Sequence, residues 1–265
     1  MENNNQKIKT IILCGGIGAR LKEETEFKPK PMVEIGGKPI LWHIMKIYAA
    51  HGFNNFVLAL GYKGDYIKDY FLRQKYYASD VGLNTVAGTE IFHDNSDSKS
   101  NDNFDVILAD TGLETPHGER VLKLKKYIQD DVFMVTYGDG VADIDINKLV
   151  KFHKSHGRIA TVTGVHPVAR WGLINADSNS MVSEFAQKPL LYDYINGGFM
   201  VFNKDFFSFL KAGDMIEDAL ARLIPQKQLV LYKHEGCWHC MDTYRDYLSL
   251  NDLWIKDPKW KIWKS

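Results

Sequence analysis

The sequence predicts an α/β protein with a Rossmann-like, doubly wound sheet that is mixed but mostly parallel. Short β-branched apolar runs alternate with stretches in which apolar residues recur at helical spacing. Two of the apolar runs end directly at glycine-rich turns, at residues 14–16 and 138–140. Ligands of such sheets bind at the carboxyl ends of the strands. The two strand ends marked by glycine are therefore the predicted site.

The first half of the chain supplies a regular alternation of strands and helices. A buried strand over residues 9–13 precedes the first glycine turn, and helical periodicity follows over residues 39–51. The same patterns predict strands at 55–60, 105–109 and 132–137, and helices at 65–72 and 119–128. Residues 94–103 are almost all Asn, Asp, Ser and Lys, so we expect a surface loop there rather than a domain boundary.

The second half of the chain predicts strands that complete the same sheet. A helix at 146–156 is followed by apolar runs at 160–165, 173–175, 199–202 and 229–232, with helices at 204–210 and 216–224. After a helix at 243–254, the tail carries Trp260 and Trp263, which we expect to pack against the body or a neighbouring subunit. We expect residues 1–265 to form a single domain with a small β and helical extension at its carboxyl end.

The composition excludes several classes of protein. Lys plus Arg and Asp plus Glu number 33 each, so no net basic field attracts nucleic acid or an anionic membrane. No apolar stretch approaches the roughly 20 residues that span a bilayer. Three cysteines make no disulfide framework in a chain of 265 residues, and no secretory leader is evident, so we expect a cytoplasmic protein.

Cys237 and Cys240 have the spacing of half a zinc site or of a redox motif. No second pair of ligands accompanies them, and no βαβ unit begins around them. A metal or redox role for these two cysteines is therefore disfavoured.

The turn after the first strand has the residue types of a phosphate site, namely Gly15, Gly16, Gly18 and Arg20. Backbone N–H groups can converge on phosphate oxygens there, and a guanidinium adds a matching fork of donors. The turn is not a P-loop, since no Gly-Lys-Ser/Thr follows, and Arg20 stands where a dinucleotide fingerprint has its third glycine. Nearby, Pro29 and Pro31 hold the backbone extended, which aims Lys30 as a second phosphate contact.

These motifs belong to a longer pattern. From Leu13 the chain reads Leu-Cys-Gly-Gly-Ile-Gly-Ala-Arg-Leu, and from Lys28 it reads Lys-Pro-Lys-Pro-Met-Val-Glu-Ile-Gly-Gly-Lys-Pro-Ile-Leu-Trp-His-Ile-Met. This pattern resembles the sugar-1-phosphate nucleotidyltransferases, and among them the members that use CTP. The resemblance continues at residues 61–64, 110–112, 137–143, 196–199 and 241–243, so it covers nearly the whole chain.

The resemblance implies a GT-A-like nucleotidyltransferase fold and a role for each part of the chain. Residues 8–145 would bind the nucleotide, residues 146–242 the acceptor, and residues 243–265 would form the carboxyl-terminal helix and tail. The implied nucleotide-binding residues are Leu13, Gly15, Gly16, Gly18, Arg20 and Gly138, with Thr111, Gly118 and Arg120 at the base and ribose. The implied acceptor-binding residues are Arg170, Trp171, Gly172, Lys188, Asn196, Gly197 and Gly198. Asp139 and Asp242 would hold Mg²⁺, and the implied catalytic residues are Arg20, Lys30, Asp139 and Lys188.

The implied reaction transfers CMP from CTP to a sugar 1-phosphate, with α-D-glucose 1-phosphate as the favoured acceptor. The product is a CDP-sugar for the biosynthesis of cell-surface polysaccharide. Because the acceptor's phosphate is already ionised, no general base is needed, and positioning with charge neutralisation suffices. Relatives commonly assemble, so we expect a homo-oligomer whose interface uses the polar loop near Ser98 or the tryptophan-bearing tail.

Three departures from the family pattern leave the acceptor open. Trp171 replaces a phenylalanine, Gln187 replaces a glutamate, and Asp218-Ala219-Leu220 stands where the family has Glu-Pro-Leu. Another sugar, a polyol or a small phosphorylated metabolite is therefore an alternative acceptor. A catalytically silent nucleotide-binding subunit is a second alternative, although such a subunit has no need of both aspartates. A nicotinamide-dependent dehydrogenase is a distant third.

Overall fold

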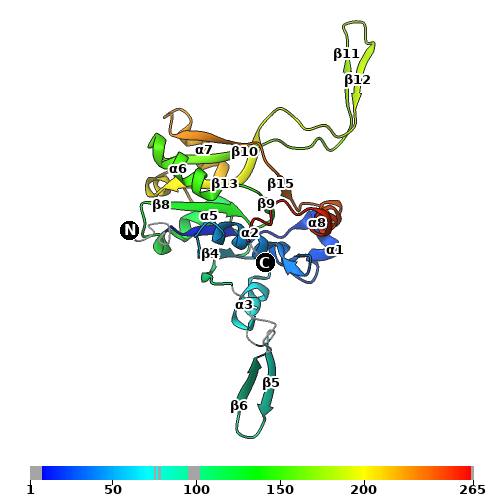
Figure 1. Ribbon diagram of the computed structural model, residues 1–265. Helices are drawn as coiled ribbons and strands as arrows, with labels where there is room; N and C mark the ends of the chain where they lie inside the picture. The colour runs from blue at the N-terminus through cyan, green and yellow to red at the C-terminus, as the bar shows by residue number, and fades with distance from the viewer. Residues whose placement is uncertain (1–7, 75, 77–78, 95–101, 264–265) are drawn as a thin grey trace.

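A computed structural model describes residues 8–74, 76, 79–94 and 102–263. It confirms the predicted α/β class, because a seven-stranded sheet of order β14-β10-β13-β8-β1-β4-β7 runs through the body (Figure 1). Strand β13 is antiparallel to both of its neighbours, β8 and β10, whereas all other neighbouring strands are parallel. The sheet is thus mixed and mostly parallel, as predicted.

The strands of this sheet come from both halves of the chain, and all of them were predicted from the sequence. They are β1 (Thr10–Leu13), β4 (Asn55–Leu60), β7 (Asp105–Asp110), β8 (Val132–Tyr137), β10 (Ala160–Val165), β13 (Ile195–Asn203) and β14 (Leu229–His234). Side chains alternate between the faces: Ile12 packs into one core, and Ile11 with Leu13 into the other. Because both faces are buried, the strands are continuous apolar runs.

Helices cover both faces of the sheet. The core of one face contains buried residues of α2 (Ile40–Ala49), α3 (Gly64–Leu72), α6 (Ile146–His156) and α8 (Tyr244–Lys256). The core of the other contains those of α5 (His117–Lys123) and α7 (Ile216–Leu223). The predicted helix at 119–128 is shorter, since α5 ends at Lys123 and a 3-10 turn, Lys125–Tyr127, follows. The predicted helix at 204–210 is also a 3-10 helix, Lys204–Phe209. The short helix α1 (Lys22–Thr25) follows the glycine turn.

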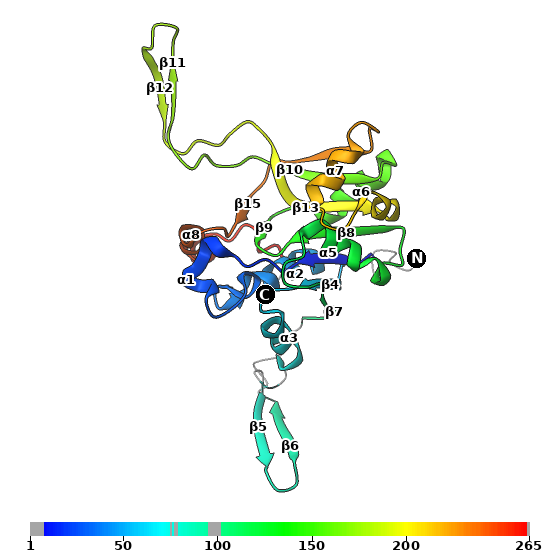
Figure 2. The same ribbon diagram turned by 180° about the vertical axis from the view of Figure 1, so that it is seen from behind.

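Four two-stranded sheets accompany the main sheet in the described part of the chain. Two of them lie close to the body, β2 (Glu34–Ile35) with β3 (Lys38–Pro39) and β9 (Gly140–Ala142) with β15 (Trp238–Cys240). The other two are hairpins that project from opposite ends of the molecule, β5 (Ser79–Asn84) with β6 (Thr89–Asp94) and β11 (Leu173–Ala176) with β12 (Val182–Ala186), as Figures 1 and 2 show. We call residues 166–194, which join β10 to β13 and carry the second hairpin, the arm.

One predicted strand lies on the arm and does not belong to the main sheet. The run at 173–175 was expected in the main sheet, but β11 pairs with β12 in a two-stranded sheet of its own. All four residues of β11 are exposed, so its apolar side chains are not buried by the body. The hairpin β5–β6 was not predicted at all, because its sequence lacks a clear alternation of apolar and polar residues.

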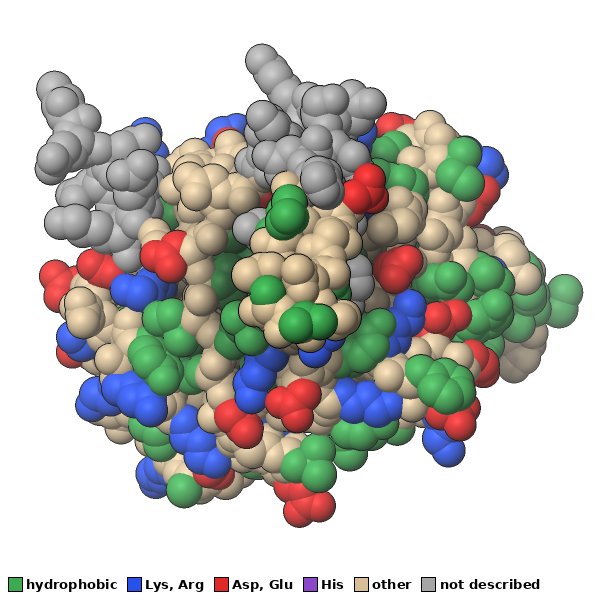
Figure 3. Space-filling model, turned by 90° about the horizontal axis from the view of Figure 1, so that it is seen from below, with side chains coloured by type: hydrophobic (Ala, Val, Ile, Leu, Met, Phe, Trp, Pro, Cys, Tyr) green, Lys and Arg blue, Asp and Glu red, His purple; other side chains and the backbone are tan. Residues whose placement is uncertain are grey.

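The surface carries charges of both signs. Figure 3 views the molecule from the side of the β5–β6 hairpin, and Lys and Arg side chains are interspersed there with Asp and Glu. None of the described helices is long and apolar enough to cross a membrane. Most of the predicted polar loop, residues 95–101, lies outside the described residues, but Asp102 at its end accepts hydrogen bonds from Trp42 (2.5 Å) and Lys46 (2.9 Å) on α2.

The tryptophan-bearing tail packs against the body of its own chain, which was one of the two expected positions. Trp260 is fully buried, and its ring and that of Trp263 lie beside the imidazole of His43 on α2. His43 Nε2 donates to the carbonyl oxygen of Ile35 (2.9 Å), and His43 Nδ1 accepts from Trp260 Nε1 (3.4 Å). A neutral imidazole satisfies both bonds, whereas a protonated one would place two donors against each other.

We expect the protein to lose stability as the pH falls from about 6.5 to about 4. Burial lowers the pKa of both His43 and His153 from 6.5 to about 4 in the folded protein. In that window the unfolded chain takes up protons that the folded protein does not, so the free energy of unfolding decreases by about 1.4 kcal/mol per pKa unit for each histidine. Urea unfolding at pH 7 and pH 4.5 measures this loss.

Carboxylates also titrate in this window, so a variant isolates the histidine contribution. His43→Gln keeps a donor for Ile35 but binds no proton, and we expect it to lose clearly less stability between the two pH values. His51→Gln, at a partly exposed site on the surface of the body, serves as the control. An equal loss in His43→Gln and the wild type would contradict the assignment.

Candidate active site

A cleft of about 420 Å³ opens above the carboxyl ends of β1 and β8. It lies where the glycine-marked strand ends predicted a ligand site. Residues far apart in the sequence line it, including the glycine turn, Lys30 and Asp242. The predicted site residues that line this cleft are Leu13, Gly16, Gly18, Arg20, Lys30, Gly138, Asp139 and Asp242.

Three glycines of the cleft have different structural roles. Gly18 adopts a left-handed conformation (φ 68°) at the start of a 3-10 turn, Ala19–Leu21. A Cβ on Gly138 would lie 2.8 Å from the carbonyl oxygen of Leu13, so β1 and β8 can approach only if this residue is glycine. A Cβ on Gly16 would meet no atom within 4 Å, so its backbone borders open space in which phosphate oxygens can approach.

Two carboxylates and one ammonium group form the centre of the cleft. Lys30 Nζ lies 2.6 Å from Asp139 Oδ2 and 2.8 Å from Asp242 Oδ1, so it bridges the two side chains. Asp242 Oδ2 also lies 3.3 Å from Arg20 Nη1 and 3.7 Å from Arg170 Nη2. Asp139 follows β8, whereas Asp242 follows β15, which pairs with β9 and so returns the chain to this point.

The charges at this centre hold one another ionised. Burial alone would lower the pKa of Lys30, but the two aspartates outweigh it and raise this pKa. Burial would likewise raise the pKa of Asp242, yet Lys30, Arg20 and Arg170 lower it. The centre therefore carries two carboxylates and several cations at neutral pH.

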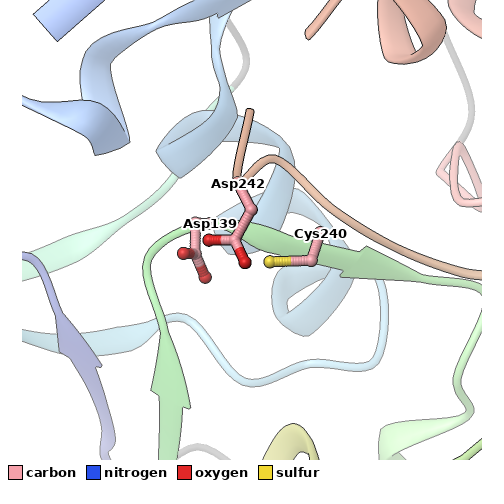
Figure 4. Close-up of side chains that lie close together, drawn as sticks. All are labelled: Asp139, Cys240 and Asp242. Carbon is pink, nitrogen blue, oxygen red and sulfur yellow. The ribbon is translucent and has the colours of Figure 1, made fainter. Parts of the chain in front are cut away.

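The same centre fits a hard divalent cation. Asp139, Asp242 and Cys240 each offer one ligand atom, and these atoms lie within 4.8 Å of one another. Figure 4 shows that the three side chains point toward one another. Burial, followed by the nearby aspartates, raises the pKa of the Cys240 thiol, and sulfur is a soft ligand that hard cations do not favour. The carboxylate oxygens suit Mg²⁺, and the bridging Lys30 ammonium demonstrates that this pair accommodates a cation.

A second cavity, of about 240 Å³, adjoins the first. The two share Tyr137, Asp139 and Asp242, so the carboxylate centre lies between them. Asn196 and Gly197, both predicted site residues, line the second cavity, and Trp238 closes it by donating from Nε1 to the carbonyl oxygen of Gly197 (2.9 Å). Gly198 packs directly against the ring of Tyr137, which leaves no room for a side chain.

Four predicted nucleotide-binding residues line neither cavity: Gly15, Thr111, Gly118 and Arg120. The Arg120 side chain is buried, and its guanidinium donates to the carbonyl oxygens of Gly15 (3.1 Å), Gly112 (2.7 Å) and Leu113 (3.0 Å). The buried Thr111 hydroxyl donates to Leu60 and accepts from Arg120 (both 2.6 Å), and Gly118 packs against the backbone at Asp214 and Met215. In this conformation, Arg120 binds the glycine turn from behind and faces away from the cleft.

The acceptor-side residues of the arm are also separate from the two cavities. Arg170 reaches Asp242, but Trp171 is 77% exposed, and Gly172 and Lys188 lie further along the arm. Val168 pairs with Leu190 in antiparallel register, which places exposed Lys188 across from Arg170. The structure therefore does not bring Lys188 into the cleft, because the arm projects from the body and its two strands pair with each other.

The three departures from the family pattern were predicted to cluster on the acceptor side, but one of them does not lie there. Trp171 and Gln187 lie on the arm, where the Gln187 side chain packs against Gly172. Asp218, by contrast, accepts a hydrogen bond from the backbone N–H of Met215 (2.8 Å) at the start of α7. This carboxylate caps the start of the helix, a role that carries no information about the acceptor.

Among the residues that line these cavities and were not assigned to the site from the sequence are His117, Tyr137 and Trp238. Tyr137 was detectable, because it ends β8 immediately before Gly138. Trp238 was set aside with the Cys-x-x-Cys motif that contains it. His117 begins α5 at the cleft wall, where burial lowers its pKa and keeps the imidazole neutral at pH 7. No local pattern marks a histidine in that place.

Comparisons with known proteins agree with this geometry. Residues 9–256 match the family model described as nucleotidyl transferase. A glucose-1-phosphate cytidylyltransferase of Salmonella typhi is 42% identical over 263 residues, which cover 97% of this chain and 100% of that protein. A probable glucose-1-phosphate cytidylyltransferase of Bacillus subtilis is 39% identical, over 97% of this chain and 100% of that protein. The UTP-bound UGPase of Acinetobacter baumannii shares the fold, with a TM-score of 0.67 at 15% identity and 93% coverage of both chains.

Proposed function

The chain belongs to the nucleotidyl transferase family, and we propose that it transfers CMP from CTP to a sugar 1-phosphate, with α-D-glucose 1-phosphate as the acceptor. The products would be a CDP-sugar, for cell-surface polysaccharide biosynthesis, and pyrophosphate. The choice of CTP and of glucose 1-phosphate rests on the relatives of 42% and 39% identity, which span the whole chain. The reaction class rests on the site itself.

One observation carries the proposal: two cavities meet at a pair of carboxylates. The larger cavity has the glycine turn and Arg20, which suit a triphosphate, and the smaller one has Asn196, Gly197 and Trp238, which suit a small polar acceptor. Asp139 and Asp242 line both. A nucleotide in the first cavity and an acceptor in the second would therefore bring their phosphates together at this centre.

The proposed reaction needs little covalent chemistry from the protein. An oxygen of the acceptor's phosphate attacks the α-phosphorus of CTP, and the bond from this phosphorus to the bridging oxygen of the β-phosphate breaks. The attacking phosphate is ionised at neutral pH, so no group has to remove a proton. Arg20 and the backbone of the glycine turn would neutralise and orient the departing pyrophosphate.

Asp139 and Asp242 would hold Mg²⁺, which supplies charge neutralisation between the phosphates of the two substrates. The Lys30 ammonium, which bridges both carboxylates in this structure, would then be free to turn toward the phosphates. Arg120 would support the site indirectly by holding the Gly15 carbonyl oxygen. Contacts of Thr111, Gly118 and Arg120 with the base and ribose remain part of the proposal, and they would require the wall at α5 to move.

The direct test is an assay of pyrophosphate release. We expect release from CTP, Mg²⁺ and α-D-glucose 1-phosphate, and at least about tenfold lower kcat/KM with UTP, GTP or ATP. Product mass against a library of sugar, polyol and other small phosphates identifies the acceptor. Release only with another phosphate would retain the cytidylyltransferase activity and replace the sugar, whereas no release with any acceptor would contradict the proposal.

A catalytically silent subunit is less well supported. Lys30 lies within hydrogen-bond distance of both Asp139 and Asp242, and Arg20 forms an ion pair with Asp242, an arrangement that a binding module does not need. CTP binding without turnover over the whole acceptor library would favour this alternative.

We also propose a cytoplasmic homo-oligomer. The described cysteines Cys14, Cys237 and Cys240 are all free thiols, which suits a reducing compartment. Both projecting hairpins expose large apolar side chains, such as Val86 on the tip of one and Phe185 on the other, at 98% and 61%. Apolar groups on such projections usually meet a partner surface, and a second copy of the chain is the simplest partner.

A further inference from the structure

The arm joins the body where three strand ends meet. Strands β10 and β14 end on this edge and β13 begins on it, because β10 is parallel to β14 and antiparallel to β13. His166 directly follows β10, Tyr194 directly precedes β13, and Glu235 directly follows β14. The two ends of the arm and one residue of the body therefore come together at one point.

These three side chains contact one another closely. The Tyr194 hydroxyl donates to Glu235 Oε1 (2.5 Å), and His166 Nε2 lies 3.2 Å from Glu235 Oε2. The rings of His166 and Tyr194 pack with their centroids 4.3 Å apart, and the Lys233 ammonium lies 5.3 Å from the centre of the Tyr194 ring. One carboxylate of the body thus holds both ends of the arm.

The tautomer of His166 follows from its surroundings. Its Nδ1 atom is buried without a hydrogen-bond partner among the described residues, whereas Nε2 faces the carboxylate. The proton therefore belongs on Nε2, from which it is donated to Glu235. Hydrogen bonds to a charged acceptor are stronger than those between neutral groups, so the Glu235 carboxylate, whose side chain is 64% exposed, links both ends of the arm.

The direction of the arm determines where its residues lie. Just beyond the contact between His166, Tyr194 and Glu235, two backbone hydrogen bonds join the outgoing and returning segments of the arm. They run from Ala169 N–H to the Pro189 carbonyl and from Leu191 N–H to the Pro167 carbonyl. The next residues are Arg170, which reaches Asp242 at 3.7 Å, and Lys188, across from it. A small rotation at the base moves both cations relative to the acceptor cavity.

We propose that His166, Tyr194 and Glu235 form a clamp that sets the direction of the arm, and that they are positioning residues for Arg170 and Lys188. This inference rests on the proposed function, since it assigns these two cations to the acceptor's phosphate. The clamp touches neither of the two cavities, and it acts through the arm alone.

Kinetics of clamp variants test the inference. In Tyr194→Phe and Glu235→Ala we expect the KM for the sugar phosphate to rise at least about fivefold, because misplaced contacts are costly in such reactions, while the KM for CTP stays within about twofold. Glu235→Gln keeps an oxygen that accepts from Tyr194, and it should restore most of the loss. Tyr192→Phe, two residues away on the segment of the arm that leads to β13 and 96% exposed, is the matched control.

Hydrogen exchange gives a readout that is independent of activity. We expect faster exchange at the amides of Ala169 and Leu191 in Tyr194→Phe than in Tyr192→Phe, with an unchanged Tm. Unaltered exchange would overturn the clamp whatever the activity, and so would equal increases in both KM values or full activity of Glu235→Ala. Failure of the proposed function is distinct, because the wild type would then release no pyrophosphate while the exchange difference persisted.

Discussion

Asp139→Asn should lower kcat at least about 100-fold, the scale seen when one charge-stabilising group is removed from a transition state. Asparagine keeps the shape of the side chain but loses the charge. Asp139 Oδ2 lies 2.6 Å from Lys30, at the junction of the two cavities, so the variant removes half of the carboxylate pair. Asp242→Asn should have an effect of similar size, and either variant should need more Mg²⁺ for its residual rate.

The controls separate chemistry from folding. Asp252→Asn makes the same change on the surface of α8, where Asp252 pairs with Lys256 at 2.8 Å, and its kcat should stay within about twofold of the wild type, as surface pairs contribute little. Circular dichroism and Tm should show that Asp139→Asn is folded. A folded Asp139→Asn protein with a kcat within about threefold of the wild type would remove this carboxylate from the reaction.

Lys188→Ala should lower kcat/KM for the sugar phosphate more than about tenfold, with the KM for CTP within about twofold, because the lost ammonium is assigned to the acceptor's phosphate alone. It is a strict test of the role assigned to Lys188, since this side chain is exposed on the arm and lies outside both cavities. Initial rates at varied sugar phosphate and saturating CTP, and the reverse, measure the two constants.

The chain offers a matched control for this lysine. Lys227 is also exposed and also has a left-handed backbone, with φ 54° against 51° for Lys188. Lys227→Ala therefore makes the same substitution at the same backbone conformation, on a turn that follows α7. It should leave both KM values unchanged. If Lys188→Ala behaved like Lys227→Ala, the acceptor's phosphate would have to be bound by other groups, such as Arg170, which lies 3.7 Å from Asp242.

The strands of the body and the glycine turn were predictable because their signals are local. Continuous apolar runs such as 55–60 mark strands that are buried on both faces, and the structure has β4 over the same residues. The predicted helix at 146–156 is likewise α6, which Asp145 caps and Gly157 ends. The carboxylates and the turn were found from short motifs and a family resemblance.

Local signals failed where exposure replaces burial. The arm and the β5–β6 hairpin have apolar residues on surfaces that the body does not cover, so a strand within them has no alternation that points to a core. Arg120 illustrates the opposite case. This side chain was predicted to contact the nucleotide, but it is buried beneath the glycine turn. The five hydrogen bonds that its guanidinium donates compensate for the loss of water.

By itself the sequence determined the class of the fold, the positions of its main strands along the chain, the glycine turn and the identity of the charged residues. Only the tertiary structure decided that Lys30 bridges Asp139 and Asp242, the latter 212 positions away, and that two cavities meet there. It alone placed Lys188 on a projecting arm. Periodicity and turn chemistry act over a few neighbouring residues, whereas a site is built from contacts between strand ends, which depend on how the whole sheet is ordered.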